Sequence, residues 1–166
     1  MRVLITSASK HGSTAEIARE IGQALEQHGL EVEVTEPGEV SMIDGFDAVV
    51  LGSAVYAGHW LEPALTFAER FGSSLARKDV FLFSSGPIGD PPKPAEDPVD
   101  VAEVLALTGS GTHRVFSGKL DRSKLGFAER AMVAAFRAPY GDFRDWDEIR
   151  AWAGEIALTL KAADPA

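Results

Sequence analysis

A run of hydroxyl side chains near the N-terminus is the stretch with the clearest chemical potential. Thr6-Ser7-Ala8-Ser9-Lys10-His11-Gly12-Ser13-Thr14 contains five hydroxyls and one glycine. If a helix begins at Ser13, its first turn offers unpaired N–H groups and a partial positive charge, and Gly12 lets the backbone wrap closely around an anion. Ser9, Ser13 and Thr14 could add hydroxyl donors. We therefore expect an anion site; simple helix capping by Ser13 or Thr14 is the alternative, although one cap needs only one hydroxyl.

Two later segments also suit contact with a ligand. Gly52–Trp60 combines glycines with the aromatic Tyr56, and Ser84–Asp90 contains Gly86 and Gly89, which allow close approach of the backbone. The sequence lacks GxxxxGK[ST] and GxGxxG, which argues against a P-loop nucleotidase and a dinucleotide site.

These segments must be positioned by alternating strands and helices. We expect strands over 2–6, 30–35, 47–53, 80–83 and 113–117. We expect helices over 13–28, 60–75, 99–107 and 123–137 and from 145 onwards. The proline-rich stretch 84–98 is predicted to be irregular. Right-handed crossovers then give a doubly wound α/β fold in one domain, 1–166, with ligands beyond the carboxyl ends of the strands.

The hydroxyl-rich turn resembles the phosphate loop of flavodoxins, (S/T)-x-x-G-x-T. The resemblance implies a flavodoxin-like three-layer sandwich with a five-stranded parallel sheet in the order 2-1-3-4-5 and an extra helical segment after the fifth strand. It also implies FMN as cofactor, with the 5′-phosphate held without a metal. The implied phosphate ligands are Ser9, Lys10, His11, Gly12, Ser13 and Thr14. Lys10 and His11 depart from the small hydroxyls usual in short flavodoxins.

The same resemblance assigns contacts to the flavin ring. In flavodoxins the loops after the third and fourth strands lie along the isoalloxazine, often through an aromatic side chain, which Tyr56 supplies here. The implied ring contacts are Ser53, Ala54, Val55, Tyr56, Ala57 and Gly58 in one loop and Ser85, Gly86, Pro87 and Gly89 in the other. Ordinary packing against the next helix is the alternative for Tyr56 and Trp60.

Within the superfamily the sequence is most similar to the bacterial flavodoxin-type protoporphyrinogen oxidases. The similarity rests on Gly58-His59-Trp60, on a helical segment over roughly 119–142, and on Asp145-Trp146-Asp147. It implies FMN-dependent oxidation of protoporphyrinogen IX with a quinone as acceptor. No catalytic acid or base is assigned, because no His–carboxylate pair can be placed from the sequence.

A basic island lies inside the extra segment. From Arg122 to Arg137 there are four cations and one anion, in a chain whose formal charge is −9. An amphipathic helix over 122–137 could lie on an anionic membrane surface or dock a partner. The alternative is a helix that covers the edge of the sheet.

Composition excludes several classes of protein. The acidic balance opposes general nucleic-acid binding, and the absence of cysteine excludes disulfides, Fe–S clusters and thiolate zinc. The four histidines have no metal-site spacing, so we expect no metal. Without a signal-peptide pattern we expect a soluble cytoplasmic protein, with peripheral contact at the inner face of the cell membrane if the basic island binds lipid.

Three functions remain open. The first is an FMN-dependent oxidoreductase of the protoporphyrinogen oxidase type, and the second is a one-electron carrier that docks redox proteins. The third is a flavodoxin-shaped module without flavin that serves in regulation or interaction. A receiver domain is rejected, because Thr6-Ser7 and Gly52-Ser53 stand where it needs acidic residues.

Overall fold

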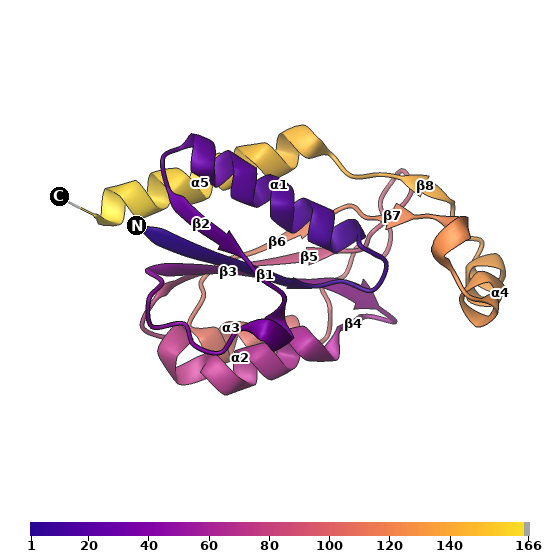
Figure 1. The fold of residues 1–166 in the computed structure, drawn as a ribbon. Coiled ribbons are helices and arrows are strands. Elements are labelled where there is room, and N and C mark those ends of the chain that lie inside the picture. The colour runs from indigo at the N-terminus through magenta and orange to yellow at the C-terminus, as the bar shows by residue number, and fades with distance from the viewer. Residues whose placement is uncertain (165–166) are drawn as a thin grey trace.

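Alternating apolar strands and amphipathic helices build a three-layer structure in the computed structural model, which describes residues 1–164 (Figure 1). The parallel strands are arranged in the order β2-β1-β3-β5-β6. Because β4 is a short antiparallel strand outside this series, the order equals the predicted 2-1-3-4-5 for the five parallel strands. Their bounds are β1 (Arg2–Ala8), β2 (Glu31–Val34), β3 (Ala48–Tyr56), β5 (Asp79–Ser85) and β6 (His113–Phe116). All carboxyl ends therefore point to one side, the right-hand side in Figure 1.

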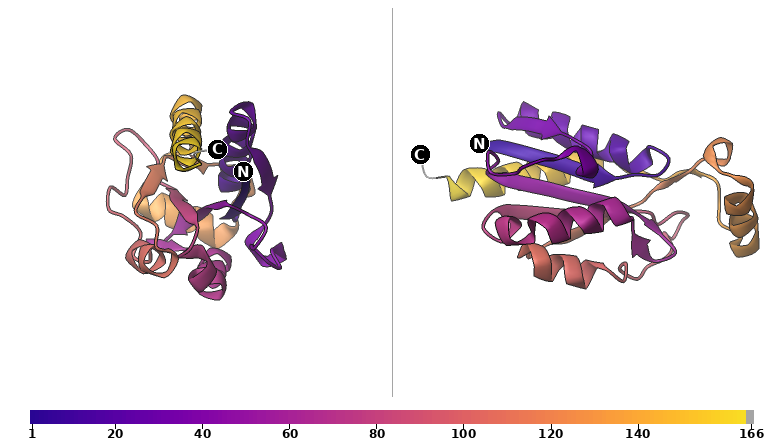
Figure 2. Two further views of the ribbon diagram at one scale, coloured as in Figure 1. Left: turned by 90° about the vertical axis from the view of Figure 1, so that its left-hand side faces the viewer. Right: turned by 60° about the horizontal axis from the view of Figure 1, so that its bottom comes forward.

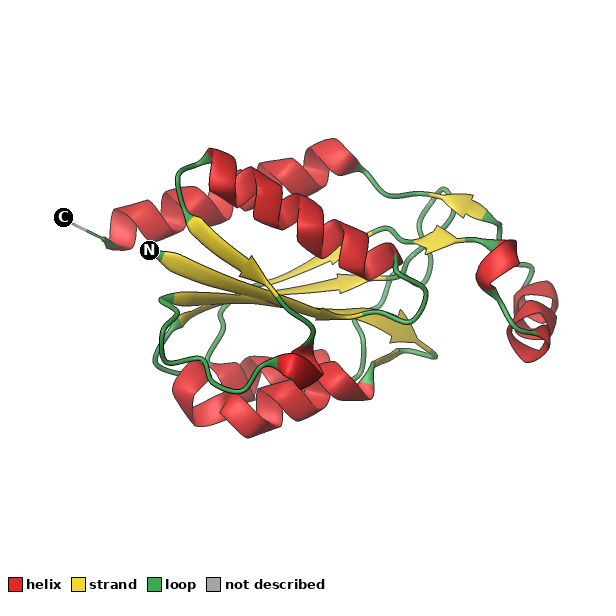
Figure 3. Cartoon of the chain, in the orientation of Figure 1, coloured by secondary structure: helices red, strands yellow, loops and turns green. Residues whose placement is uncertain are grey.

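Helices cover both faces of this sheet (Figures 2 and 3). One face carries α1 (Ser13–Gln27) and α5 (Trp146–Ala163), and the other carries α2 (Glu62–Leu75), α3 (Val101–Thr108) and the 3-10 turn η1 (Pro37–Glu39). In α1 the apolar side chains Ile17, Ile21 and Leu25 recur every four residues and are fully buried. Gly29, at φ 85°, then reverses the chain into β2.

Two apolar cores lie on opposite faces of the sheet. In β1, Val3 and Ile5 face α1 and α5, whereas Leu4 faces α2. Both faces are buried, which explains the unbroken apolar run of the central strands. Under α5 the rings of Phe83, Phe116 and Trp152 meet with centroids 5.5–6.0 Å apart.

The third strand continues into a tight hairpin. β3 runs to Tyr56, and Ala57 and Gly58, both with positive φ, turn the chain into β4 (His59–Trp60), which pairs antiparallel with β3. The prediction that a helix begins at Trp60 was therefore wrong. Trp60 is 3% exposed in the core under α2, so ordinary packing accounts for this side chain.

The proline-rich segment is more regular at its start than predicted. β5 extends through Ser85, Gly86 N–H donates to the Phe116 carbonyl, and Ile88 and Lys93 form a bridge. The irregular stretch predicted from residue 84 is therefore shorter. The sheet pairing continues because β6 offers acceptors beyond Ser85.

Residues 118–142 form an arm that leaves the sheet after β6 and returns to α5. Its elements are β7 (Lys119–Leu120), the 3-10 turn η2 (Arg122–Lys124), α4 (Phe127–Phe136) and β8 (Gly141–Asp142). β7 and β8 pair antiparallel, and α4 lies beyond the carboxyl ends of the strands (Figures 1 and 2). The helix predicted over 123–137 is thus two pieces, separated at Gly126, the N-cap of α4. Since α4 contains no buried residue, it does not cover the edge of the sheet.

Candidate functional site

The first helix begins with free donors. Gly12 is the N-cap of α1 at φ 88°, and no side chain caps this end. Ser9 Oγ accepts the Gly12 N–H at 3.1 Å, and Glu16 N–H makes the first bond to the Gly12 carbonyl. Capping by Ser13 or Thr14 is therefore wrong as an explanation of the loop. Within residues 1–164 the N–H groups of Ser13 and Thr14 have no acceptor, so they remain available to an anion.

A buried hydroxyl stands beside these donors. Thr14 is 2% exposed and lines a cavity, yet its side chain makes no hydrogen bond within the described part of the chain. Because this hydroxyl is accessible from the cavity, it is available to a ligand acceptor there. Thr6 Oγ1 is also unpartnered, but Thr6 shares its face of β1 with Leu4 and so points toward the α2 core.

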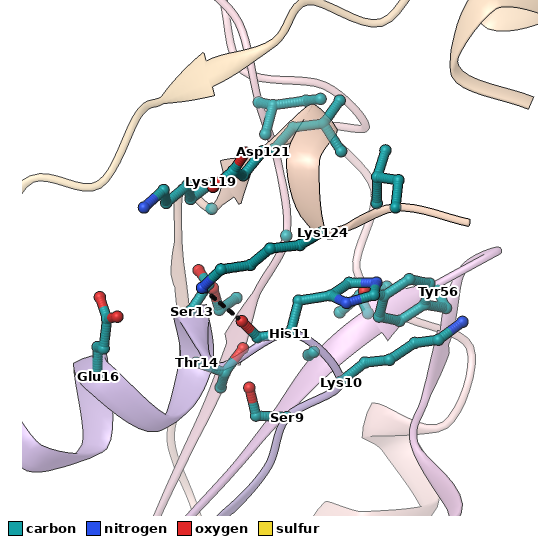
Figure 4. A pocket seen from close by; sticks show the side chains of 18 residues that line it. Ser9, Lys10, His11, Ser13, Thr14, Glu16, Tyr56, Lys119, Asp121 and Lys124 are labelled. Carbon is teal, nitrogen blue, oxygen red and sulfur yellow. Dashed lines mark hydrogen bonds between the residues drawn. The ribbon is translucent and has the colours of Figure 1, made fainter. Parts of the chain in front are cut away.

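The first cavity has a volume of about 130 Å³ and lies between residues 9–14, the ends of β3 and β5, and the start of the arm (Figure 4). We call residues 9–14 the phosphate loop, after the motif that they resemble. The cavity gathers ten of the residues proposed from the sequence: Ser9, Lys10, His11, Ser13, Thr14, Ala54, Val55, Tyr56, Ser85 and Gly86. Gly12 lies in the loop that forms one wall. Three segments of the chain, spread from Ser9 to Gly86, therefore converge on one site.

The other proposed residues lie outside this cavity. Ser53 is fully buried, donates to the Ala54 carbonyl at 2.7 Å and accepts from Leu61 N–H at 2.9 Å, so its hydroxyl is used to join β3 to α2. Gly89 backs onto the arm, since a Cβ there would lie 3.3 Å from Pro139 Cγ. Ala57, Gly58 and Pro87 line a second cavity.

Glu129 of α4 contacts two side chains of this loop, those of His11 and Lys10. Its carboxylate lies 2.8 Å from His11 Nε2 and 3.6 Å from Lys10 Nζ. The hydrogen bond from His11 is the main cause that lowers the pKa of Glu129, so this carboxylate is ionised at neutral pH. Lys10 Nζ also lies 4.9 Å from the centroid of the Tyr56 ring.

Tyr56 is a neutral aromatic surface in this setting. Burial raises the pKa of its phenol to about 12, and the nearby charge of Glu129 acts in the same direction. The His11 ring meets it edge-on at 6.3 Å between centroids. The side chain of Tyr56, at the end of β3, therefore packs against Lys10 and His11 of the loop.

Arg144, which follows β8, binds the first turn of α1. Its guanidinium donates to Glu16 at 2.7 Å, to the Ser13 carbonyl at 3.2 Å and to Asp142 at 2.8 Å, and its side chain is 3% exposed. The hydrogen bond from Arg144 lowers the pKa of Glu16, which keeps that carboxylate charged and paired. The negative charge of Glu16, near the start of α1, is thus balanced by the positive charge of Arg144.

The balance of charge in the first cavity is positive although the protein is acidic. Three lysines and two carboxylates line it: Lys10, Lys119, Lys124, Glu16 and Asp121. Both Lys119 and Lys124 come from the arm, and Lys124 Nζ donates to the His11 carbonyl at 3.2 Å. An anion entering the loop would therefore meet ammonium groups as well as N–H donors.

The second cavity differs in character. Its volume is about 370 Å³, and its wall is mainly apolar, with Val55, Val115, three prolines, and Met132 and Phe136 of the arm. Val55 and Gly86 line both cavities, so they form the wall between them.

A buried polar chain stands behind the second cavity. Trp60 Nε1 donates to Ser84 Oγ at 2.8 Å, and Ser84 Oγ lies 2.7 Å from His113 Nε2. Because an indole N–H can only donate, the Ser84 hydroxyl accepts it and donates its own proton to a neutral His113. Burial lowers the pKa of His113, which agrees with this neutral form.

Six charged residues of the site were not proposed from the sequence: Glu16, Lys119, Asp121, Lys124, Glu129 and Arg144. Lys124 was noticed only as one cation of the basic island. Nothing local indicated that it reaches the carbonyl of His11, which is 113 residues away.

Comparison with known proteins gives a consistent picture of the fold. A family model described as a flavodoxin domain matches residues 4–147. A flavodoxin from the domain Archaea is 19% identical with a TM-score of 0.65, covering 97% of this chain and 99% of its own. Flavodoxin 1 from Bacillus cereus is 17% identical with a TM-score of 0.63, covering 96% of this chain and 98% of its own.

A longer enzyme contains the same fold. The rubredoxin oxygen:oxidoreductase from Desulfovibrio gigas is 18% identical with a TM-score of 0.67 over 99% of this chain. This chain spans only 37% of that protein. No relative was found among the curated proteins.

Proposed function

This chain belongs to the flavodoxin domain family, and from that premise we propose that it binds FMN non-covalently and carries electrons between redox partners. One observation carries the proposal: the start of α1 is uncapped, with Gly12 at φ 88° and with Thr14 buried beside it without a hydrogen bond. That arrangement suits a phosphate group better than it suits an isolated helix end. When bound, FMN supplies the redox chemistry, and the protein supplies binding, electrostatics and access.

The residues present fit the phosphate end of FMN. The N–H groups of Ser13 and Thr14 and the hydroxyls of Ser9, Ser13 and Thr14 would hold it. Each carboxylate nearby has a partner: Arg144 binds Glu16, His11 binds Glu129, and the Ser123 hydroxyl donates to Asp121, whose charge Lys119 and Lys124 also offset. A cavity of about 130 Å³ is below the usual range for a whole small-molecule site, roughly 300–1,000 Å³, which suits one end of the cofactor.

For the flavin ring we assign the rest of the predicted contacts by their place in the structure. Ala54, Val55, Tyr56, Ser85 and Gly86 line the first cavity, and Ala57, Gly58 and Pro87 lie just across the wall formed by Val55 and Gly86. Tyr56 offers an aromatic face that stays uncharged at neutral pH, since its pKa is about 12. Ser53 and Gly89 contribute through packing.

Reconstitution with FMN tests this function. We expect the purified chain, incubated with FMN and desalted, to keep a yellow flavin spectrum, and the reduced form to pass electrons to a redox protein such as rubredoxin. Transfer should slow as salt is added if charged surfaces steer the partners. A colourless protein after reconstitution would instead support the module without flavin.

An oxidase of an organic substrate is the second candidate. The observation that favours it is the second cavity, whose volume of about 370 Å³ falls in the range of small-molecule sites and whose wall includes Met132 and Phe136. Protoporphyrinogen IX as substrate and a quinone as acceptor belong to this candidate. Saturable oxidation of protoporphyrinogen coupled to menaquinone, by this protein alone, would favour it over the carrier.

For the oxidase with a quinone acceptor, we propose that residues 122–137 contact the membrane surface. On α4 the side chains of Phe127, Met132 and Phe136 are exposed, by 91%, 55% and 78%. Within residues 1–164, no helix is long and apolar enough to cross a bilayer. Co-sedimentation with anionic vesicles, compared with an Arg130→Glu, Arg137→Glu variant, tests contact with the surface. The likeness to flavodoxins favours the carrier that docks redox proteins.

A further inference from the structure

The arm returns to the phosphate loop and is fastened there. Three polar contacts join them: His11 Nε2 to Glu129 at 2.8 Å, Lys10 Nζ to Glu129 at 3.6 Å, and Lys124 Nζ to the His11 carbonyl at 3.2 Å. We propose that the arm is a cofactor clasp, in which Lys124 is a ligand of the FMN phosphate and Glu129 holds the clasp closed. This inference rests on the proposed function.

Lys124 is placed and equipped for this role. Its side chain lines the first cavity with Ser13 and Thr14, and Figure 4 shows its ammonium group turned toward the start of α1. The ammonium uses one of its three donors on the His11 carbonyl. Among the described residues no ion pair joins it to a carboxylate, although its charge helps to lower the pKa values of Asp121 and Glu16, which line the same cavity. Its two remaining donors are therefore available to an anion.

The loop's own basic side chains, Lys10 and His11, already have partners. Lys10 and His11 are the two side chains that depart from the small hydroxyls of the motif, and both are bound by Glu129. Lys10 also lies over the Tyr56 ring. The departure from the motif therefore fastens the arm, and the positive charge for the phosphate comes from the arm instead of the loop.

Glu129 is suited to hold the clasp. The hydrogen bond from His11 lowers the pKa of its carboxyl, so it stays ionised and keeps both contacts at neutral pH. Although α4 buries no residue, these ion pairs and the β7–β8 pairing hold the arm beside the loop. A phosphate bound by both Lys124 and the loop would join the arm and α1 through one ligand.

The test compares FMN with riboflavin, which lacks the phosphate, in three forms of the full chain. Lys124→Met removes the ammonium and keeps an apolar stem. Lys93→Met is the matched control, because Lys93 is exposed and its side chain has no partner among the described residues. Dissociation constants from flavin fluorescence quenching are measured at low and high salt. Hydrogen exchange of the peptide covering 119–136 is measured with each flavin.

We expect Lys124→Met to weaken FMN binding roughly ten- to a hundredfold, the range for a hydrogen bond to a charged group, and to leave riboflavin binding unchanged. FMN, but not riboflavin, should slow exchange in 119–136, and the variant should lose that protection. Equal effects of Lys124→Met and Lys93→Met, or an equal loss for both flavins, would overturn the clasp and leave FMN binding standing. If the wild-type chain binds no FMN, the proposed function and the clasp both fall.

Discussion

The two cavities at the carboxyl end of the sheet share a wall but differ in volume and in the polarity of their lining residues. The first, of about 130 Å³, is lined by hydroxyls, three lysines and the start of α1, and the second, of about 370 Å³, is lined mainly by apolar side chains. Both receive residues from the arm, but the first receives Lys119 and Lys124 and the second receives Met132 and Phe136. The first part of the arm thus lines the charged cavity, and its helix α4 lines the apolar cavity.

The difference in lining suits the two cavities to different parts of a bound molecule. The N–H groups and hydroxyls in the first cavity suit a small anion, because each donor has a fixed geometry. Apolar walls in the second cavity recognise surface area and shape, which many organic molecules provide. We therefore expect changes in the first cavity to alter FMN affinity and changes in the second to alter what reaches the flavin.

The largest expected effect is at the start of α1. Replacing Ser13 and Thr14 together by Ala should weaken FMN binding by about 1–3 kcal/mol, or roughly five- to 150-fold, because hydrogen bonds to a charged phosphate are lost. Fluorescence titration measures the change. If Met132→Ala, in the second cavity, weakened FMN binding to the same extent, the proposed difference between the two cavities would be wrong.

The second cavity should respond to different substitutions. Met132→Ala combined with Phe136→Ala removes apolar wall and should raise the KM for a small quinone such as menadione by roughly fivefold, from about 1 kcal/mol of lost apolar contact. FMN affinity should stay within twofold of wild type. An unchanged KM for menadione would show that the cavity does not receive organic acceptors.

Tyr56 tests the boundary between the two sites. An electron-rich phenol beside the ring disfavours added electron density, so Tyr56→Ala should raise the two-electron midpoint potential by roughly 10–30 mV, matching about 0.5–1.5 kcal/mol. Because the pKa of Tyr56 is about 12, the difference should be the same from pH 6 to pH 9. Tyr56→Phe is the control and should lie close to wild type. Identical potentials in all three proteins would remove Tyr56 from the ring.

The smallest effect concerns His113 behind the second cavity. Burial lowers the pKa of His113 in the folded protein, so its contribution to stability is complete above the unfolded pKa of about 6.5 and is lost as pH falls below it. The free energy of unfolding, measured with urea at several pH values, should therefore fall more steeply between pH 8 and pH 5 for wild type than for His113→Gln. The difference in slope should be at most about 1.4 kcal/mol per pH unit. Parallel curves would show that His113 does not couple to folding.

Sequence reasoning reached the fold through local patterns. The spacing of Ile17, Ile21 and Leu25 defined α1, and apolar runs such as Val80–Phe83 defined buried strands, because periodicity and burial are local properties. It failed at Trp60, where two residues of turn geometry at Ala57 and Gly58 carry the chain into β4 instead of a helix. A propensity for helix cannot reveal such a hairpin.

The site was only partly predictable for a related reason. The motif around Gly12 indicated an anion site, since helix start, glycine and hydroxyls are adjacent in the sequence. The partners of Lys10 and His11 could not be found in this way, because Glu129 lies 118 residues beyond His11 and meets it only when the arm folds back. The partners of Lys10 and His11 thus depend on contacts between distant segments, which the types of these two residues do not predict.

Titration of the flavin-free wild-type chain with FMN, with riboflavin in parallel, tests the central claim most directly. If the start of α1 holds a phosphate, FMN fluorescence should be quenched to a one-to-one end point, and riboflavin should bind at least roughly tenfold more weakly. Equal affinity for the two flavins, or no quenching of FMN at any ratio, would contradict the account.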